Sequence, residues 1–80
     1  MTANRNEYGQ PYGEGPHYQH GDTGQELEMR RNGLRVRFFD MRTGWQVGPE
    51  HANVAPACAW AGANGYFSPA LARAGIFYNY

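Results

Sequence analysis

Lysine is absent from this 80-residue chain, cysteine occurs once, and no apolar run approaches the roughly 20 residues that a membrane-spanning helix needs. The single cysteine, Cys58, excludes a disulfide within the chain. Met1 is followed by polar residues instead of a basic and then an apolar region, so no signal peptide is expected. We therefore expect a protein without a membrane span, which stays in the compartment where it is made or leaves it inside a larger particle.

The formal net charge is zero, because the chain contains seven basic and seven acidic residues. Zero net charge argues against a general binder of polyanions. All seven basic residues are arginine, a usage that is first of all typical of a GC-rich genome and that also favours planar, bidentate contacts.

Residues 1–24 contain little apolar surface and many glycines and prolines, so neither a helical nor a strand period persists there. Tyr8, Tyr12 and Tyr18 are spaced between these residues. Tyrosine offers a large contact area for few torsions, and proline lowers the entropy lost when an extended chain docks. We therefore expect residues 1–24 to be an extended arm, disordered in isolation, whose tyrosines bind a partner protein, and residues 25–80 to form one small β-rich module.

Asn32-Gly33 is the strongest local signal in that module, since Asn-Gly is the preferred centre of a two-residue type I′ hairpin. With that turn, Met29 faces Val36 and Leu27 faces Phe38, which makes one side of the hairpin apolar. A hairpin is therefore predicted.

A competing interpretation takes Thr23-x-x-Glu26 as a capping box and continues a helix to Gly33. That helix would have only two turns and would discard the matched apolar register of the hairpin. The hairpin is preferred.

A third strand is expected over residues 45–47 and is expected to end at Pro49. The fold class is then a small β or α+β protein built on a three-stranded antiparallel meander, about 25–48. Ser68, Pro69 and Gly75 suit the two ends of a short C-terminal helix at about 69–74, whereas the alanine- and glycine-rich stretch 52–66 permits no assignment. The expected apolar side of the meander comprises Leu27, Met29, Leu34, Val36, Phe38, Trp45 and Val47.

Three arginines, Arg30, Arg35 and Arg37, fall on the polar side of the predicted hairpin. The expected register pairs Arg37 with Glu28 and sets Arg30 opposite Arg35, where the two cations repel unless an anion lies between them. A phosphate group or a partner's carboxylate would meet that need. Binding of RNA or DNA through this hairpin is therefore the alternative function.

Four residues are weak candidates for a metal site, because imidazole and thiolate suit tetrahedral zinc. They are His17, His20, His51 and Cys58. One cysteine is few for a structural zinc site, and a small buried cysteine is the simpler interpretation. Cys58 with His51 is the only nucleophile and base pair by residue type, and no third group or oxyanion element accompanies it. No enzyme activity, catalytic residue or cofactor is expected.

Two segments resemble pieces of the BIR domain, a zinc-binding module of apoptosis inhibitors. They are Pro49-Glu50-His51 with Pro56-x-Cys58, and Leu71-Ala72-Arg73-Ala74-Gly75-Ile76-Phe77-Tyr78. The order is the reverse of the family's, and Phe38 and Met41 stand where its paired cysteines are expected. The resemblance implies a metal-stabilised protein-interaction domain, which is the second alternative.

The chain ends in an aromatic tail that includes Phe77, Tyr78 and Tyr80, and such clusters seldom stay exposed on a monomer. Together with the arm and the small module, this tail indicates a structural accessory subunit of a multi-copy assembly. A bacteriophage capsid decoration protein or another minor virion protein is the most concrete example. The expected partners are other protein subunits, including copies of this chain, and not a membrane or a small-molecule substrate.

Overall fold

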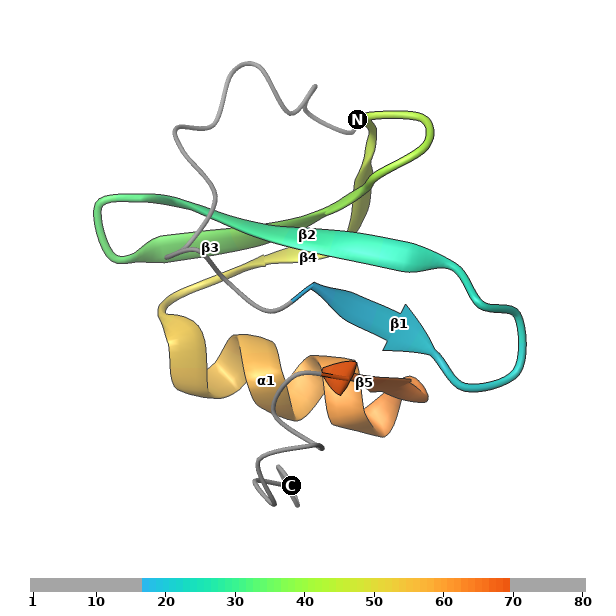
Figure 1. Cartoon of the computed structure of the whole chain (residues 1–80). Helices are drawn as coiled ribbons and strands as arrows, with labels where there is room; N and C mark the ends of the chain where they lie inside the picture. The colour runs from blue at the N-terminus through green and yellow to red at the C-terminus, as the bar shows by residue number, and fades with distance from the viewer. Residues whose placement is uncertain (1–16, 70–80) are drawn as a thin grey trace.

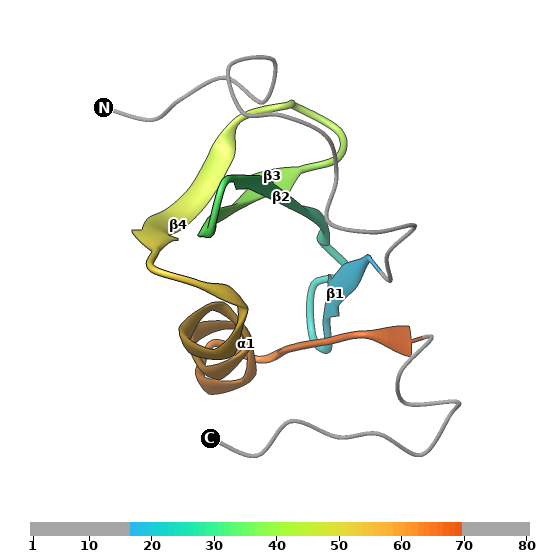
Figure 2. The same cartoon turned by 90° about the vertical axis from the view of Figure 1, so that its left-hand side faces the viewer.

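Five strands and one helix make up residues 17–69, the part of the chain that the computed structural model describes (Figure 1). They are β1 (Tyr18–His20), β2 (Glu26–Asn32), β3 (Arg35–Asp40), β4 (Gln46–His51), α1 (Val54–Ala63) and β5 (Tyr66–Phe67). The strands form one antiparallel sheet in the order β4-β3-β2-β1-β5. The sheet curls into an arc, and α1 lies across its open side (Figure 2). The predicted β-rich class is correct, but the expected three-stranded meander is the β2-β3-β4 part of a five-stranded sheet.

The predicted hairpin is present with its turn displaced by one residue. Asn32 pairs with Arg35, so the two turn residues are Gly33 and Leu34, and Gly33 has φ +64°. Glycine with positive φ at the first turn position is typical of a type II′ turn. Met29 consequently faces Phe38 instead of Val36, a register shift of two residues that leaves each side chain on its expected face.

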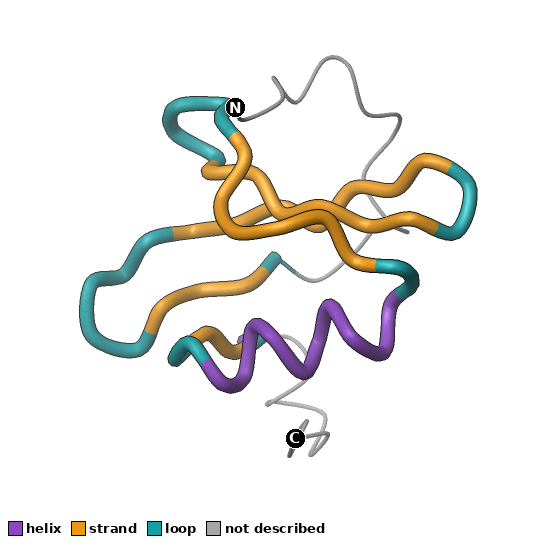
Figure 3. The backbone as a smooth tube through the Cα atoms, turned by 180° about the vertical axis from the view of Figure 1, so that it is seen from behind, coloured by secondary structure: helices purple, strands orange, loops and turns teal. Residues whose placement is uncertain are grey.

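Leu34 and Trp45, both expected on the apolar side, are instead exposed. The displaced turn puts Leu34 at the tip of the hairpin, where no strand residue lies opposite it. The tip and the β1–β2 turn project at opposite ends of the sheet (Figure 3). The apolar side of the sheet is therefore narrower than the sequence pattern predicts.

Strand β4 does not end at Pro49 but continues to His51. Pro49 is tolerated because β4 is an edge strand of the sheet, where a missing N–H breaks no ladder on the outer side. The register shifts between Val36 and Phe38, and Gly48 has φ +76°. This β-bulge bends β4 toward α1.

Helix α1 occupies the stretch that the sequence left unassigned. Asn53 is its N-cap and accepts a hydrogen bond from the Ala55 N–H at 2.9 Å. Pro56 stands in the first turn, where its missing N–H has no helical partner in any case. The helix ends at Ala63 with Asn64 as its C-cap, and Gly65 follows with φ +86°.

The core lies between α1 and the concave side of the sheet. Small residues of α1, namely Ala57, Cys58 and Ala61, are buried and let the helix lie close to the strands. Partly buried aliphatic and aromatic side chains, Val47, Val54, Trp60 and Tyr66, pack around this core. The sheet contributes Tyr18, Leu27, Met29, Val36 and Phe38.

The predicted arm, residues 1–24, includes strand β1, which belongs to the sheet. Tyr18–His20 pairs with β2 on one side and β5 on the other, and Tyr18 is only 4% exposed. The remaining tyrosines of the predicted arm, Tyr8 and Tyr12, lie outside the described residues. The predicted helix at about 69–74 also lies outside them, except for its first residue, Pro69. Within residues 17–69, no helix is long and apolar enough to cross a membrane.

We predict that Gly48→Ala lowers the free energy of unfolding by about 3 kcal/mol. An L-residue is strained at φ +76°, and a Cβ at this position would overlap the indole ring of Trp60. Urea unfolding followed by circular dichroism measures the loss.

Gly33→Ala is the matched control, because Gly33 has a similar φ of +64° and a Cβ added there would meet no atom of the described residues within 4 Å. It should cost about 1–2 kcal/mol from backbone strain alone. Equal losses in the two variants would show that the contact between Gly48 and Trp60 does not matter.

Candidate functional site

The outer face of the sheet, opposite α1, carries the three arginines that the sequence singled out. Arg30 and Arg37 are direct cross-strand partners, and Arg35 follows on the same face of β3. The expected opposition of Arg30 and Arg35 is therefore replaced by that of Arg30 and Arg37. Glu28 is opposite Phe39, not Arg37.

Carboxylates of the same chain neutralise these arginines. Glu28 Oε1 accepts a hydrogen bond from Arg30 Nη1 at 2.9 Å. Glu50 on β4 accepts from Arg37 Nε at 3.1 Å and from Arg35 Nη1 at 3.3 Å. The anion that two facing arginines require is thus supplied internally, by one glutamate on β2 and one on β4.

This ion-pair layer leaves Arg35 as the most accessible of the three arginines, with its side chain 70% exposed. The side chains of Arg30 and Arg37 are 13% and 24% exposed and are held by short hydrogen bonds, including one from Arg37 Nη1 to Gln46 Oε1 at 3.0 Å. Charge-assisted bonds of this kind fix the side chains in place. The layer can therefore present a preorganised polar surface, with a charge excess of one arginine over its two glutamates.

Three large apolar side chains project from the described part of the chain: Leu34 at the hairpin tip is 81% exposed, Trp45 before β4 is 51% exposed, and Phe67 on β5 is 44% exposed. Each is attached to a strand or to a hydrogen-bonded turn. Trp45, for example, accepts a hydrogen bond from the Asp40 N–H at 2.9 Å and donates its own N–H to Thr43 Oγ1 at 3.2 Å. These side chains are available for contact with another molecule.

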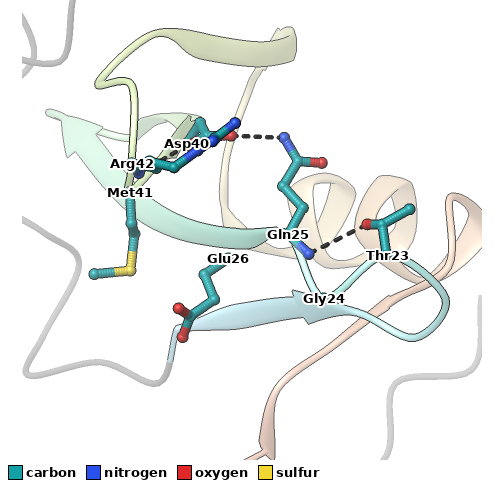
Figure 4. Close-up of a pocket in the computed structure, with 7 residues that line it drawn as sticks. All are labelled: Thr23, Gly24, Gln25, Glu26, Asp40, Met41 and Arg42. Atoms are coloured by element: carbon teal, nitrogen blue, oxygen red, sulfur yellow. Dashed lines mark hydrogen bonds between the residues drawn. The ribbon is translucent and has the colours of Figure 1, made fainter.

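A polar hollow of about 490 Å³ lies where the β1–β2 turn meets the β3–β4 turn (Figure 4). Its lining comprises Thr23, Gly24, Gln25, Glu26, Asp40, Met41 and Arg42. Gln25 Nε2 donates to Asp40 Oδ2 at 2.9 Å, and Gln25 Oε1 accepts from the Tyr66 hydroxyl at 2.6 Å. Gln25 therefore connects β3 with β5 through its side chain.

Both carboxylate oxygens of Asp40 accept hydrogen bonds in this network. Its Oδ1 accepts from the backbone N–H groups of Arg42 at 2.7 Å and Thr43 at 3.0 Å, which closes the β3–β4 turn. The hydrogen bond from Gln25 is the main cause that holds the pKa of Asp40 below its usual value. Burial and the nearby Asp40 carboxylate raise the pKa of Tyr66. The network thus holds an ionised aspartate and a protonated tyrosine, which is a structural arrangement.

The four weak metal candidates lie in four different settings. His17 is exposed before β1, and His20 Nδ1 accepts from the backbone N–H of Asp22 at 3.0 Å. His51 is buried at the end of β4, and Cys58 Sγ lies 3.2 Å from the Tyr18 hydroxyl inside the core. No group of three or more His, Cys, Asp or Glu side chains suited to a metal ion occurs among residues 17–69.

The remaining predicted partner-binding residues, Phe77, Tyr78 and Tyr80, lie outside the described residues, as do Tyr8 and Tyr12. Tyr18 is packed inside its own module at 5.3 Å from the Phe38 ring, so it is a core residue and not a partner-binding one. Because the residues next to Tyr18 in the sequence are polar, the sequence pattern did not predict its burial.

Sequence reasoning missed the Gln25–Asp40–Tyr66 network. Asp40 followed by Thr43-Gly44 is a recognisable turn signal, but nothing in the sequence connects it with a glutamine 15 positions earlier. Phe39 was also missed. It is fully buried although it points to the face opposite Phe38, which the simple alternation of apolar and polar residues does not predict.

No protein-family model, curated protein or solved structure matches this chain.

We predict that Gln25→Ala raises the pKa of Asp40 back toward 3.8, because the side-chain hydrogen bond from Gln25 is the largest cause of its lowering. The ionised carboxylate stabilises the fold fully above pH 3.8, and this stabilisation is lost as the pH falls through the folded-state pKa. NMR titration of the Asp40 carboxyl carbon measures the shift.

Thr23→Ala serves as the control, since it removes a hydroxyl in the same turn without touching the bond between Gln25 and Asp40. Its Asp40 titration should match that of the wild type. An unchanged Asp40 pKa in Gln25→Ala would contradict the assignment.

Proposed function

We propose that this protein is a non-enzymatic structural subunit that joins a multi-copy assembly through contacts with other protein subunits. The observation that carries the proposal is the exposure of Leu34, Trp45 and Phe67 on ordered turns and strands. A side chain on a strand or a tight turn starts from a fixed backbone, so less backbone entropy is lost on binding, and buried aromatic anchors dominate protein interfaces.

The sheet edges support recognition through side chains instead of strand addition. Edge strand β4 contains Pro49 and the bulge at Gly48, both of which discourage pairing with a further strand. The other edge, β5, has only two residues, Tyr66 and Phe67. A partner would therefore engage the projecting side chains, with Trp45 as the central anchor.

The small size of the module also favours a partner. A unit of roughly 50 residues buries a modest fraction of its surface, so its core alone contributes little stability. Association with a partner would add to that stability. Tyr8, Tyr12, Phe77, Tyr78 and Tyr80 remain the proposed partner contacts of the two flanking segments. A bacteriophage capsid decoration protein or minor virion protein is the concrete example that we propose, by analogy with small armed subunits of such particles.

Nucleic-acid binding is the second candidate, favoured by the exposure of Arg35 beside Arg37 on the outer face. Glu50 bonds to both of these arginines, so a phosphate would compete with it. Under this candidate, Glu50→Gln raises the affinity for RNA or DNA, with a steep dependence on salt. Under the assembly proposal, Glu50→Gln leaves the association with protein subunits largely unchanged.

We predict that the protein isolated from its source has a native mass far above that of a single chain, and that Trp45→Ser weakens this association tenfold or more, about the effect of losing an interface anchor. Native mass spectrometry and analytical ultracentrifugation measure both. Ala52→Ser is the control, because Ala52 is exposed and is not adjacent in the sequence to Leu34, Trp45 or Phe67, and it should leave the assembly intact.

Two variants in the full-length chain, Tyr8→Ser and Tyr12→Ser, test the proposed arm separately from the module. Both should lower the free energy of association more than they lower the free energy of unfolding.

A folded monomer whose affinity for nucleic acid falls steeply with salt would instead select the second candidate. Unfolding by a chelator would select the metal-stabilised BIR-like domain.

A further inference from the structure

His51 lies at the junction between the sheet and the helix, two residues before the N-cap Asn53. Its side chain is buried, with 7% of the residue exposed. The imidazole ring packs against Phe38 of β3, with centroids 5.8 Å apart, and against Trp60 of α1, with centroids 5.6 Å apart. His51 therefore contacts both elements that the junction brings together.

The Nε2 atom of His51 is buried and has no hydrogen-bond partner among residues 17–69. An unsatisfied buried polar atom costs about 1–3 kcal/mol, and the cost rises when the group is charged. The folded state accepts the neutral ring at this position, but an imidazolium there would need water or an acceptor. The His51 ring can reach water or an acceptor only by moving out of its buried position.

The groups around His51 provide no compensating charge within residues 17–69. On β3, Val36 lies opposite His51, while Arg35 and Arg37 alternate to the outer face. The neighbouring Glu50 of β4 bonds to those two arginines. Helix α1 contains no charged residue, and its thiol, Cys58, bonds to Tyr18.

Trp60 transmits any movement of His51 to the rest of the fold. Its ring stacks on Phe38 at 5.6 Å and on Tyr66 at 5.8 Å, and it lies against the Gly48 backbone. These contacts join β3, β4, α1 and β5 in one aromatic cluster. Displacing the His51 ring from Trp60 therefore weakens the packing of α1 against the sheet.

We propose that His51 is a proton-operated latch, which holds α1 on the sheet when its ring is neutral and releases α1 when the ring is protonated in mildly acidic solution. The β2–β3 hairpin persists on release, because neither its six paired positions nor the ion pair between Arg30 and Glu28 involves His51. The latch is independent of which partner the module binds.

The direction of the pH dependence follows from burial, which lowers the pKa of His51 below 6.5. The neutral ring is favoured in the closed form, so stability is complete above pH 6.5 and is lost as the pH falls through the folded-state pKa. Between those two values, the opening equilibrium constant rises up to about tenfold per pH unit, the limit for uptake of one proton.

Trp60 can report the opening directly in a Trp45→Phe background, since the chain contains two tryptophans. As the pH is lowered from 8 to 4.5, the emission of Trp60 should shift to longer wavelength as the ring meets water. The NMR contact between Met29 and Phe38, which face each other across the hairpin, should survive to lower pH. Coincident loss of both signals would indicate global unfolding and overturn the latch.

His51→Phe should abolish the acid shift of Trp60, because it keeps an aromatic ring that takes up no proton. His51→Gln, which is smaller and uncharged, repeats the test if the phenylalanine does not fold. His17→Gln changes an exposed histidine and should retain the full shift.

His20 needs its own variant, since its Nδ1 accepts two backbone hydrogen bonds that protonation would break. His20→Asn retains an acceptor and should leave the transition in place. An acid shift that persists in both His51 variants, or that disappears in His20→Asn, would overturn the proposal. In the wild type, the His51 ring proton should titrate with a midpoint below 6.5, and a midpoint at or above that value would also overturn it.

Discussion

The packing of Trp60 against the Gly48 backbone is the constraint on which the rest of the fold depends. The bulge at Gly48 lets β4 bend toward the helix, and the missing side chain leaves room for the indole ring. Trp60 then brings Phe38, His51 and Tyr66 into one cluster. A helix whose buried residues are Ala57, Cys58 and Ala61 contributes little apolar area, so this single large side chain provides much of its attachment.

Local signals in the sequence were enough to predict the hairpin and the antiparallel meander, because turn residues and alternation act over short distances. The turn moved by one residue since Gly33 alone needs positive φ in the observed geometry. Helix α1 escaped prediction because Pro56 resembles a helix breaker until Asn53 is recognised as the N-cap three positions earlier. Strand β1 escaped because Tyr18 finds its partners, Leu27, Phe38 and Cys58, only through the tertiary fold.

On the candidate surfaces too, short-range sequence patterns were predictable and contacts made only in the tertiary fold were not. Sequence alternation placed Arg30, Arg35 and Arg37 together, but their neutralisation by Glu28 and Glu50 depends on the hairpin register and on the extension of β4 past Pro49. A surface that looks basic along the chain is thus an ion-pair layer in three dimensions. The exposed apolar side chains do not require a countercharge, so the proposed recognition of a partner rests chiefly on them.

Strands β1 and β5 are adjacent and antiparallel, with Gln19 opposite Phe67. The point where the chain enters the described fold and the point where it leaves are consequently neighbours on one edge of the sheet. A unit with adjoining entry and exit can interrupt a loop of another domain without separating the ends of that loop. The same geometry makes the module suited to display as an inserted guest and to circular permutation, with new ends opened at the Gly33–Leu34 tip.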